Sequence, residues 1–238
     1  MALGLCRKLD MARALSIGNP PITVQMRRSA RARRLSLRVS RLDGRVTLTV
    51  PPRAPERQAL AFLHEREDWL RGHLSQIAPA QTVGLGSIVP VEGRDRLVQA
   101  GTGRGVRLET DALQVPKADC AAMLAAFLKA LARDRLAVAS DRYAERLGRR
   151  YTKLTLRDTR SRWGSCTSAG GLMYSWRLIM APPEVLDYVA AHEVAHLVEM
   201  NHAPAFWSIV ESLVPDYAAH RLWLREHGDR LHALRFDP

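Results

Sequence analysis

The sequence predicts an α+β fold, because patterns typical of strands and patterns typical of helices follow one another along its 238 residues. Residues 33–50 alternate apolar and polar side chains on both sides of Asp43-Gly44, which predicts a β-hairpin. Residues 117–148 are rich in alanine and leucine and contain no proline, which predicts a long helix. With 47% hydrophobic residues, a chain of this length can bury a substantial core.

The first half is expected to hold a leader and one small basic domain. Residues 1–20 show no pattern of a folded element, and we expect a disordered leader there. Residues 21–116 are expected to form an α+β region, in which the hairpin is followed by a helix over residues 55–77 and by short strands punctuated by glycine.

The second domain is expected to span residues 117–238. After the long helix, strand patterns at residues 151–158 and 171–180 flank a loop and predict a small sheet. A further helix begins at Pro182-Pro183-Glu184 and has no breaker before Met200. Two more helices are expected to complete the chain, over about residues 203–213 and 216–228.

The net charge of +12 is concentrated in the first half of the chain. Residues 27–45 contain eight arginines and one aspartate. Arginine binds phosphate well, so one interpretation of this hairpin is a surface that binds nucleic acid. The alternative is an ordinary solvated strand face, which many basic segments are.

The cysteine and apolar patterns exclude several classes of protein. Cys6, Cys120 and Cys166 are widely spaced and form no Cys-x-x-Cys pair, so neither a disulfide scaffold nor a thiolate zinc site is indicated. The sequence has no apolar run of 18 residues or more, which predicts no membrane segment. We therefore expect a cytoplasmic protein whose metal ligands, if any, are imidazoles or carboxylates.

The segment "AAHEVAHLVEMNHAPAFW", residues 190–207, carries the clearest chemical signal. His192 and His196 are four residues apart and lie on one face of a helix, where both can bind one zinc ion. Glu193 would lie beside the metal, as the general base of a hydrolase requires. His202 can be the third ligand only if the helix ends first, for example at a left-handed Asn201; Glu211 is the competing third ligand.

The alternative is that these are ordinary helix residues. We favour the metal site, because apolar residues flank the polar trio and buried polar groups without partners are costly. The site predicts one zinc ion per chain.

Residues 161–217, which include "RWGSC" and the histidine motif, resemble the YgjP-like metallopeptidase domain family, relatives of the SprT-like and Wss1-like zinc peptidases. The resemblance extends more loosely over residues 25–225. It implies a zincin-like catalytic core with a long helix, a small β-sheet and an active-site helix carrying the HExxH motif. It also implies that His192, His196 and His202 bind zinc and that Glu193 is the catalytic base.

Substrate binding is expected on the strand beside the active-site helix, with residues 171–178 as the candidate edge. Arg160, Arg162, Trp163 and Arg177 are candidate substrate-binding residues, since arginine can bind a carboxylate, a phosphate or an oxyanion. Alternatively, Trp163 belongs to the core.

Three functions are compatible with these residues. The first is zinc-dependent hydrolysis of a peptide or protein, with an HExxH-x5-H site. The second is metal-dependent hydrolysis of a phosphoanhydride such as a nucleotide, although no glycine-rich phosphate-binding motif is present. The third is an SprT-like protease that acts while bound to nucleic acid, which rests on analogy alone.

Overall fold

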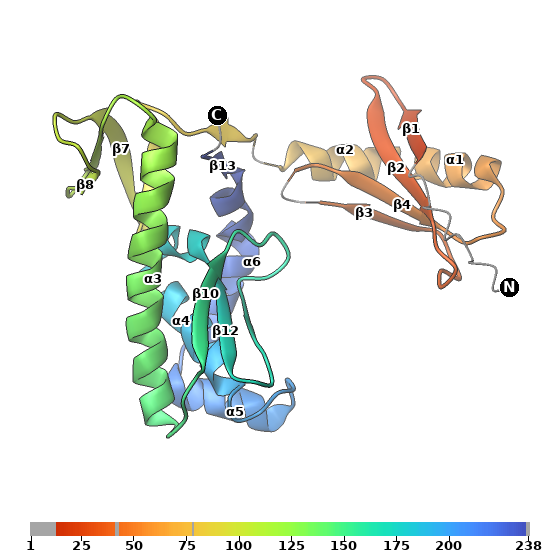
Figure 1. Cartoon of the computed structure of the whole chain (residues 1–238). Coiled ribbons are helices and arrows are strands. Elements are labelled where there is room, and N and C mark those ends of the chain that lie inside the picture. The colour runs from red at the N-terminus through yellow and green to blue at the C-terminus, as the bar shows by residue number, and fades with distance from the viewer. Residues whose placement is uncertain (1–12, 41–42, 78, 237–238) are drawn as a thin grey trace, which may run out of the picture. The chain divides into compact units, whose positions relative to one another are not determined.

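The computed structural model describes residues 13–40, 43–77 and 79–236. The chain divides into two compact units, Met1–Pro79 and Ala80–Pro238 (Figure 1). Each unit has its own apolar core. None of the described helices is long and apolar enough to cross a membrane.

The first unit is a four-stranded sheet with two helices. In sheet order the strands are β1 (Arg13–Ile17), β2 (Ile22–Arg28), β4 (Val46–Val50) and β3 (Ser36–Val39), and the helices are α1 (Glu56–Glu65) and α2 (Glu67–Ser75). The neighbours β2 and β4 are parallel, while the other pairs are antiparallel. Alternate residues of β4 are buried, and Leu63 of α1 and Leu70 of α2 join the same core, as expected where a sheet face packs on helices.

The structure confirms the hairpin over residues 33–50 as β3 and β4. The helix expected over residues 55–77 is broken, because Arg66 has φ −105° and ψ 8° between α1 and α2. The expectation of a disordered leader over residues 1–20 is wrong for Arg13–Ile17, which form β1; residues 1–12 lie outside the described chain.

The second unit begins earlier than expected. Its first strands are β5 (Gln81–Thr82), β6 (Ile88–Val91), β7 (Arg94–Ala100), β8 (Arg107–Leu108) and β9 (Ala112–Val115), and the last four form a sheet of order β6-β7-β9-β8. Val89, Val98 and Leu113 are fully or almost fully buried, in the same core as Leu124 and Leu128 of the long helix. The chain therefore divides at residues 79 and 80 and not at residues 116 and 117, because these strands bury their apolar face against the second unit.

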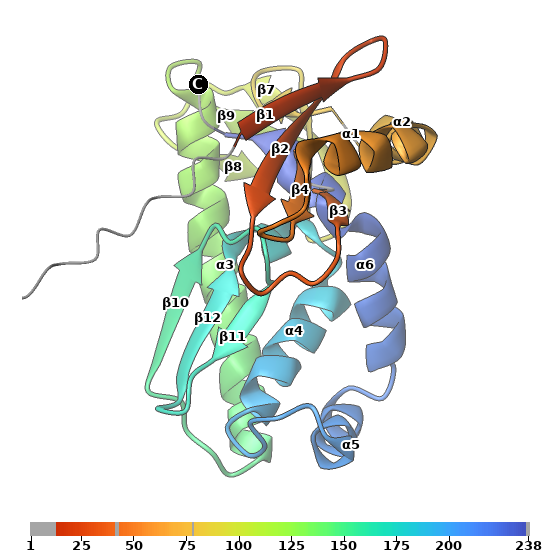
Figure 2. The same ribbon diagram turned by 90° about the vertical axis from the view of Figure 1, so that its right-hand side faces the viewer.

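The centre of the second unit is a long helix beside a three-stranded sheet. The helix is α3 (Cys120–Arg146), and the strands are β10 (Lys153–Arg157), β12 (Gly171–Ser175) and β11 (Gly164–Cys166) in sheet order. Figure 2 shows β12 between its two neighbours; it is parallel to β10 and antiparallel to β11. Buried residues recur at helical spacing along α3, and the Ser140 hydroxyl lies 3.0 Å from the Tyr174 hydroxyl of β12.

A short 3-10 helix, three α-helices and a final strand complete the unit. They are the 3-10 helix η1 (Trp176–Met180), α4 (Pro183–Ala195), α5 (Pro204–Leu213) and α6 (Tyr217–Ala233), followed by β13 (Leu234–Arg235), which pairs with β5. Helix α4 contacts α3, α5, α6 and β11. Its buried face places the histidine motif between the sheet edge and the last two helices.

Candidate metal centre

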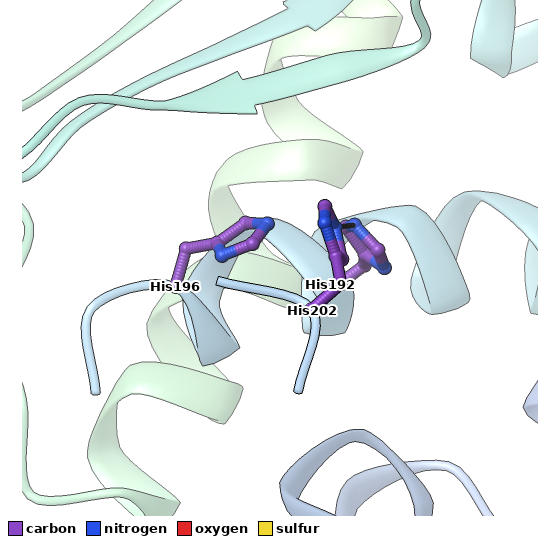
Figure 3. A group of neighbouring side chains, drawn as sticks. All are labelled: His192, His196 and His202. Atoms are coloured by element: carbon purple, nitrogen blue, oxygen red, sulfur yellow. Dashed lines mark hydrogen bonds between the residues drawn. The ribbon is translucent and has the colours of Figure 1, made fainter. Parts of the chain in front are cut away.

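Three histidines lie together at the end of α4. His192 is on the helix, His196 is the capping residue directly after its last residue, and His202 lies in the turn that follows. Figure 3 shows the three imidazoles grouped around one region. One nitrogen of each ring lies within 4.8 Å of one nitrogen of both others, and the Nε2 atoms of His192 and His202 are 3.1 Å apart.

The chain turns back after α4 through main-chain and side-chain hydrogen bonds. The helix ends at Ala195 and does not continue to Met200 as expected. The Asn201 side chain donates to the Glu199 carboxylate and accepts from the main-chain N–H of Ala203 at 2.8 Å. Asn201 is not left-handed, so that part of the prediction is wrong; its side chain holds the turn instead.

The resulting turn brings His202 to the two helical histidines. Among the described residues, Glu211 is not part of this or any other group that could hold a metal ion. It is an exposed residue of α5, so the structure does not bring the competing ligand to the site.

The three imidazoles fit a zinc ion. Two nitrogens bound to one tetrahedral zinc at about 2.0 to 2.1 Å lie about 3.3 Å apart, close to the distance between the His192 and His202 nitrogens. The Nδ1–H of His196 donates to the main-chain carbonyl of Glu199 at 3.0 Å, which leaves Nε2 with its lone pair. Burial lowers the pKa of His192 to about 3 and also lowers that of His196, so both rings are neutral at pH 7, as ligands must be.

Glu193 is a buried carboxyl group beside these histidines. Only 5% of the residue is exposed, and Oε2 has no hydrogen-bond partner among the described residues. Burial raises the pKa of Glu193 to about 8, while the nearby charge of Arg162 opposes that rise. A buried carboxylate without partners is costly, so its position here is explained better by chemistry than by stability.

Gly164 sets the position of Glu193, and we did not predict this role from the sequence. A Cβ atom on Gly164 would lie 2.5 Å from Glu193 Oε1 and 2.6 Å from its Cγ, so no other residue fits without a shift. The main chain of β11 thus lies directly against the carboxyl group. A glycine inside a strand is the signal that indicates such a close approach.

Aromatic rings fix the orientation of the imidazoles. The Phe206 ring is fully buried and stacks on His196 with centroids 4.4 Å apart. The centroid of the Trp207 ring lies 5.7 Å from the centroid of the His192 ring and 5.8 Å from that of the His202 ring. Because both aromatic residues are in the first turn of α5, this helix packs against the three histidines.

Two cavities lie next to the histidines. The larger, of about 830 Å³, is lined by Arg162, Trp163, Tyr217, Arg221 and Arg225 among others. The smaller, of about 220 Å³, includes all three histidines, together with Cys166 and Met200. Gly164, His192 and Glu193 line both cavities, so the candidate site lies between them.

Two of the four predicted substrate-binding residues lie at the site. Arg162 and Trp163 line the larger cavity, whereas Arg160 lines neither of these two cavities. Sequence reasoning missed Arg221 and Arg225, although their spacing of four residues in a predicted helix was a usable signal.

The structure does not bring Arg177, the fourth predicted substrate-binding residue, to either of these cavities. Its residue is 5% exposed, and its guanidinium group donates to Asp158 Oδ1 at 2.6 Å and to the main-chain carbonyls of Leu231 and Leu234 at 2.7 and 2.9 Å. Arg177 therefore joins the loop before β11 to the end of α6, and its donors are turned to the protein interior.

The expected substrate edge is also in a different place. Gly171–Ser175 form the central strand β12, which is paired on both sides, and residues 176–178 belong to η1. The edge beside α4 is β11, because Gly164–Cys166 pair with β12 alone. This strand of three residues lay inside the segment that we expected to be a loop.

Comparison with known proteins adds a family match. The model of the family described as "YgjP-like, metallopeptidase domain" matches residues 33–227. Curated proteins give no significant match. Among solved structures, the metallopeptidase zymogen of Pyrococcus abyssi abylysin has 20% sequence identity, with 39% of this chain and 92% of that chain covered and a TM-score of 0.35. That similarity is too low to carry an argument, and the family match stands without it.

Proposed function

The chain belongs to the YgjP-like metallopeptidase domain family, and from that premise we propose that it is a zinc-dependent peptidase with an HExxH-x5-H site. In this proposal His192, His196 and His202 hold the metal and Glu193 is the general base. The observation that carries it is the meeting of three imidazoles beside a buried carboxyl group that has no partner.

The donor set agrees with the proposed metal. Three imidazoles are a common ligand set of catalytic zinc, and His196 is oriented by the Glu199 carbonyl as metal-binding histidines usually are. When bound, zinc would polarise the carbonyl group of the substrate and lower the pKa of water.

Glu193 would move the protons. The positive charge of bound zinc would lower the pKa of Glu193 and ionise it at neutral pH. Its unpartnered Oε2 would then accept a proton from the attacking water and return it to the nitrogen of the leaving amine. Gly164 keeps the carboxyl group against β11, so that the base does not have to be ordered during the reaction.

The edge strand β11 would bind the substrate main chain. Strand β12 occupies one side of β11, and within the described chain the other side has no paired strand. An extended peptide added there would use main-chain hydrogen bonds and would pass Glu193, which contacts Gly164 in this strand. A peptide or protein substrate fits this arrangement.

Metal analysis combined with peptide cleavage tests the proposal. We expect about one zinc ion per chain, and we expect cleavage of peptide bonds that stops on chelation and returns when zinc is added. Absence of stoichiometric zinc after reconstitution at neutral pH would refute the metal site. A zinc-loaded protein that cleaves no member of a diverse peptide library would refute the peptidase.

A second candidate function is metal-dependent hydrolysis of a phosphoanhydride. The observation that favours it is the presence of Arg162, Arg221 and Arg225 in the cavity beside His192, since arginine also binds phosphate. Release of phosphate or pyrophosphate from a panel of nucleotides, compared with peptide cleavage by the same zinc-loaded preparation, separates the two functions.

Nucleic acid is a candidate partner of the first unit. Arg31, Arg33 and Arg38 are exposed on or next to the edge strand β3, whereas Arg28 donates to main-chain carbonyls of the same unit. Changing Arg31→Glu together with Arg33→Glu should weaken binding to single-stranded DNA and reduce its salt dependence, with the zinc content unchanged. Unchanged DNA binding in this double variant would remove the proposal.

A further inference from the structure

The larger cavity beside the candidate metal centre has an unbalanced charge. Three arginines line it, Arg162, Arg221 and Arg225, and the only acidic residue in its lining is Glu193. Within the described part of the chain, no carboxylate forms an ion pair with any of these arginines. Elsewhere in the same unit, Arg135, Arg142 and Arg177 each have an acidic partner. Guanidinium groups gathered without a salt bridge to a carboxylate are suited to bind an anion.

Two of the three arginines lie on one helix. Arg221 and Arg225 are one turn apart on α6, which places both on one face of the helix. The guanidinium group of Arg221 lies over the Trp207 ring, 4.9 Å from its centroid, and this ring contacts the metal-site histidines. The charge is therefore positioned relative to the histidines by a rigid aromatic group.

The walls between the charges are apolar and also fixed. Trp163 packs so closely on α6 that a Cβ atom at Gly228 would lie 2.7 Å from its ring, and His232 lies 4.9 Å from that ring between centroids. Tyr217 stacks on Trp207 at 5.3 Å. A group with an apolar stem and an anionic end matches these walls and charges.

We propose that this cavity is the subsite of the peptidase for an acidic substrate group, the carboxylate of an aspartate or glutamate side chain or of the peptide C-terminus. Arg221 and Arg225 would bind the carboxylate, and Arg162, in the loop before β11, would add a third positive charge. Trp163 and Tyr217 would contact the apolar stem. The assignment rests on the proposed peptidase function, because it gives that reaction its substrate class. Substrates with lysine or arginine at the same position are disfavoured by like charge.

Two pairs of peptides test the assignment and distinguish the two sources of the carboxylate. The first pair is amidated at the C-terminus and contains glutamate or glutamine, and the second ends in a free carboxylate or an amide. A peptide library is first cleaved by the zinc-loaded full chain and analysed by mass spectrometry. The cleavage sites found show at which position relative to the cleaved bond the glutamate or glutamine of the first pair should be placed. We expect kcat/KM to favour the acidic member of one pair by about 10- to 100-fold.

Charge-removing variants connect this preference to the cavity. Arg221→Gln with Arg225→Gln should reduce the preference to about onefold, because both proposed carboxylate ligands are lost. The matched control is Arg149→Gln with Arg150→Gln, which removes the same charge from exposed residues outside the cavity and should keep the preference. A preference that survives in the Arg221 and Arg225 variant, or that the control also loses, overturns the assignment.

Equilibrium binding makes the test independent of turnover. Zinc-loaded Glu193→Gln protein is titrated by calorimetry with each peptide and with inorganic phosphate. Tighter binding of an acidic peptide, lost with the two arginines, supports the subsite even if no peptide is cleaved, in which case only the peptidase function fails. Equal binding of acidic and neutral peptides, or arginine-dependent binding of phosphate alone, overturns the subsite.

Discussion

Replacing Glu193 by glutamine should separate the catalytic role of this residue from its effect on stability. The side chain keeps nearly the same volume but cannot accept a proton, so we expect zinc to remain bound while turnover falls by about 100- to 10,000-fold. The stability of the metal-free protein should increase, because the carboxyl group that the substitution removes is buried.

The folded protein holds the Glu193 proton more tightly than the unfolded chain does. Burial raises the pKa of Glu193 from 4.5 to about 8. The folded state is therefore destabilised as the pH rises from 4.5 through about 8, and above that pH the cost stays constant. At about 1.4 kcal/mol for each pH unit, the full cost is on the order of 5 kcal/mol, and relaxation around the charged group reduces it. Glutamine has no such proton to lose.

Thermal or urea unfolding of the metal-free proteins at several pH values measures this difference. Glu193→Gln should be more stable than the parent by about 2 to 5 kcal/mol at pH 9, and the two should be nearly equal at pH 4.5. Glu226→Gln, at an exposed position of α6, is the control and should show no such gain. Equal stability of parent and Glu193→Gln at pH 9 would refute the buried, unpartnered carboxyl group, and full activity of this variant would refute the general base.

Three further variants test the ligands, the strand contact and the buried arginine. His202→Ala should weaken zinc binding, measured by competition with a chelator, whereas Glu211→Ala should not. The loss should exceed roughly 10- to 100-fold, which is the cost of removing a hydrogen-bond partner of a ligand. The reverse result would make Glu211 the third ligand. Gly164→Ala should lower kcat by about 100-fold with zinc retained, because its Cβ meets Glu193, and an unchanged kcat would show that this carboxyl group need not be held there. Arg177→Leu should lower the free energy of unfolding by about 3 to 5 kcal/mol and leave the KM of the folded protein unchanged, whereas a raised KM with normal stability would return Arg177 to the substrate site.

The parts of the site that depend on local geometry could be predicted from the sequence. The spacing of His192 and His196 depends only on the period of a helix, and the hairpin depends on alternation around one Asp-Gly pair. The position of His202 followed from the need to end the helix. The hydrogen bonds that make this turn were not visible in the sequence, because the Asn201 side chain supports it in a conformation other than the left-handed one that we expected.

The parts that depend on distant neighbours could not be predicted. Residues 80–116 read equally well as the end of the first domain or the beginning of the second, since alternation in a strand does not show which core it covers. Strand β11 is only three residues long, too short for a recognisable pattern, so its neighbour was taken for the edge. Arg177 looked available because its partners, Asp158 and the end of α6, are 19 or more residues away in the sequence.

The pairing of β5 with β13 brings together the two places where the chain enters and leaves the second unit. Gln81 is opposite Leu234 and Thr82 is opposite Arg235, so the ends of this unit are neighbours. A short linker between them would close the unit into a ring, and new ends could then be opened in an exposed loop far from the histidines. The second unit is therefore suited to circular permutation and to insertion into a loop of another protein, where its two ends would need only a narrow gap.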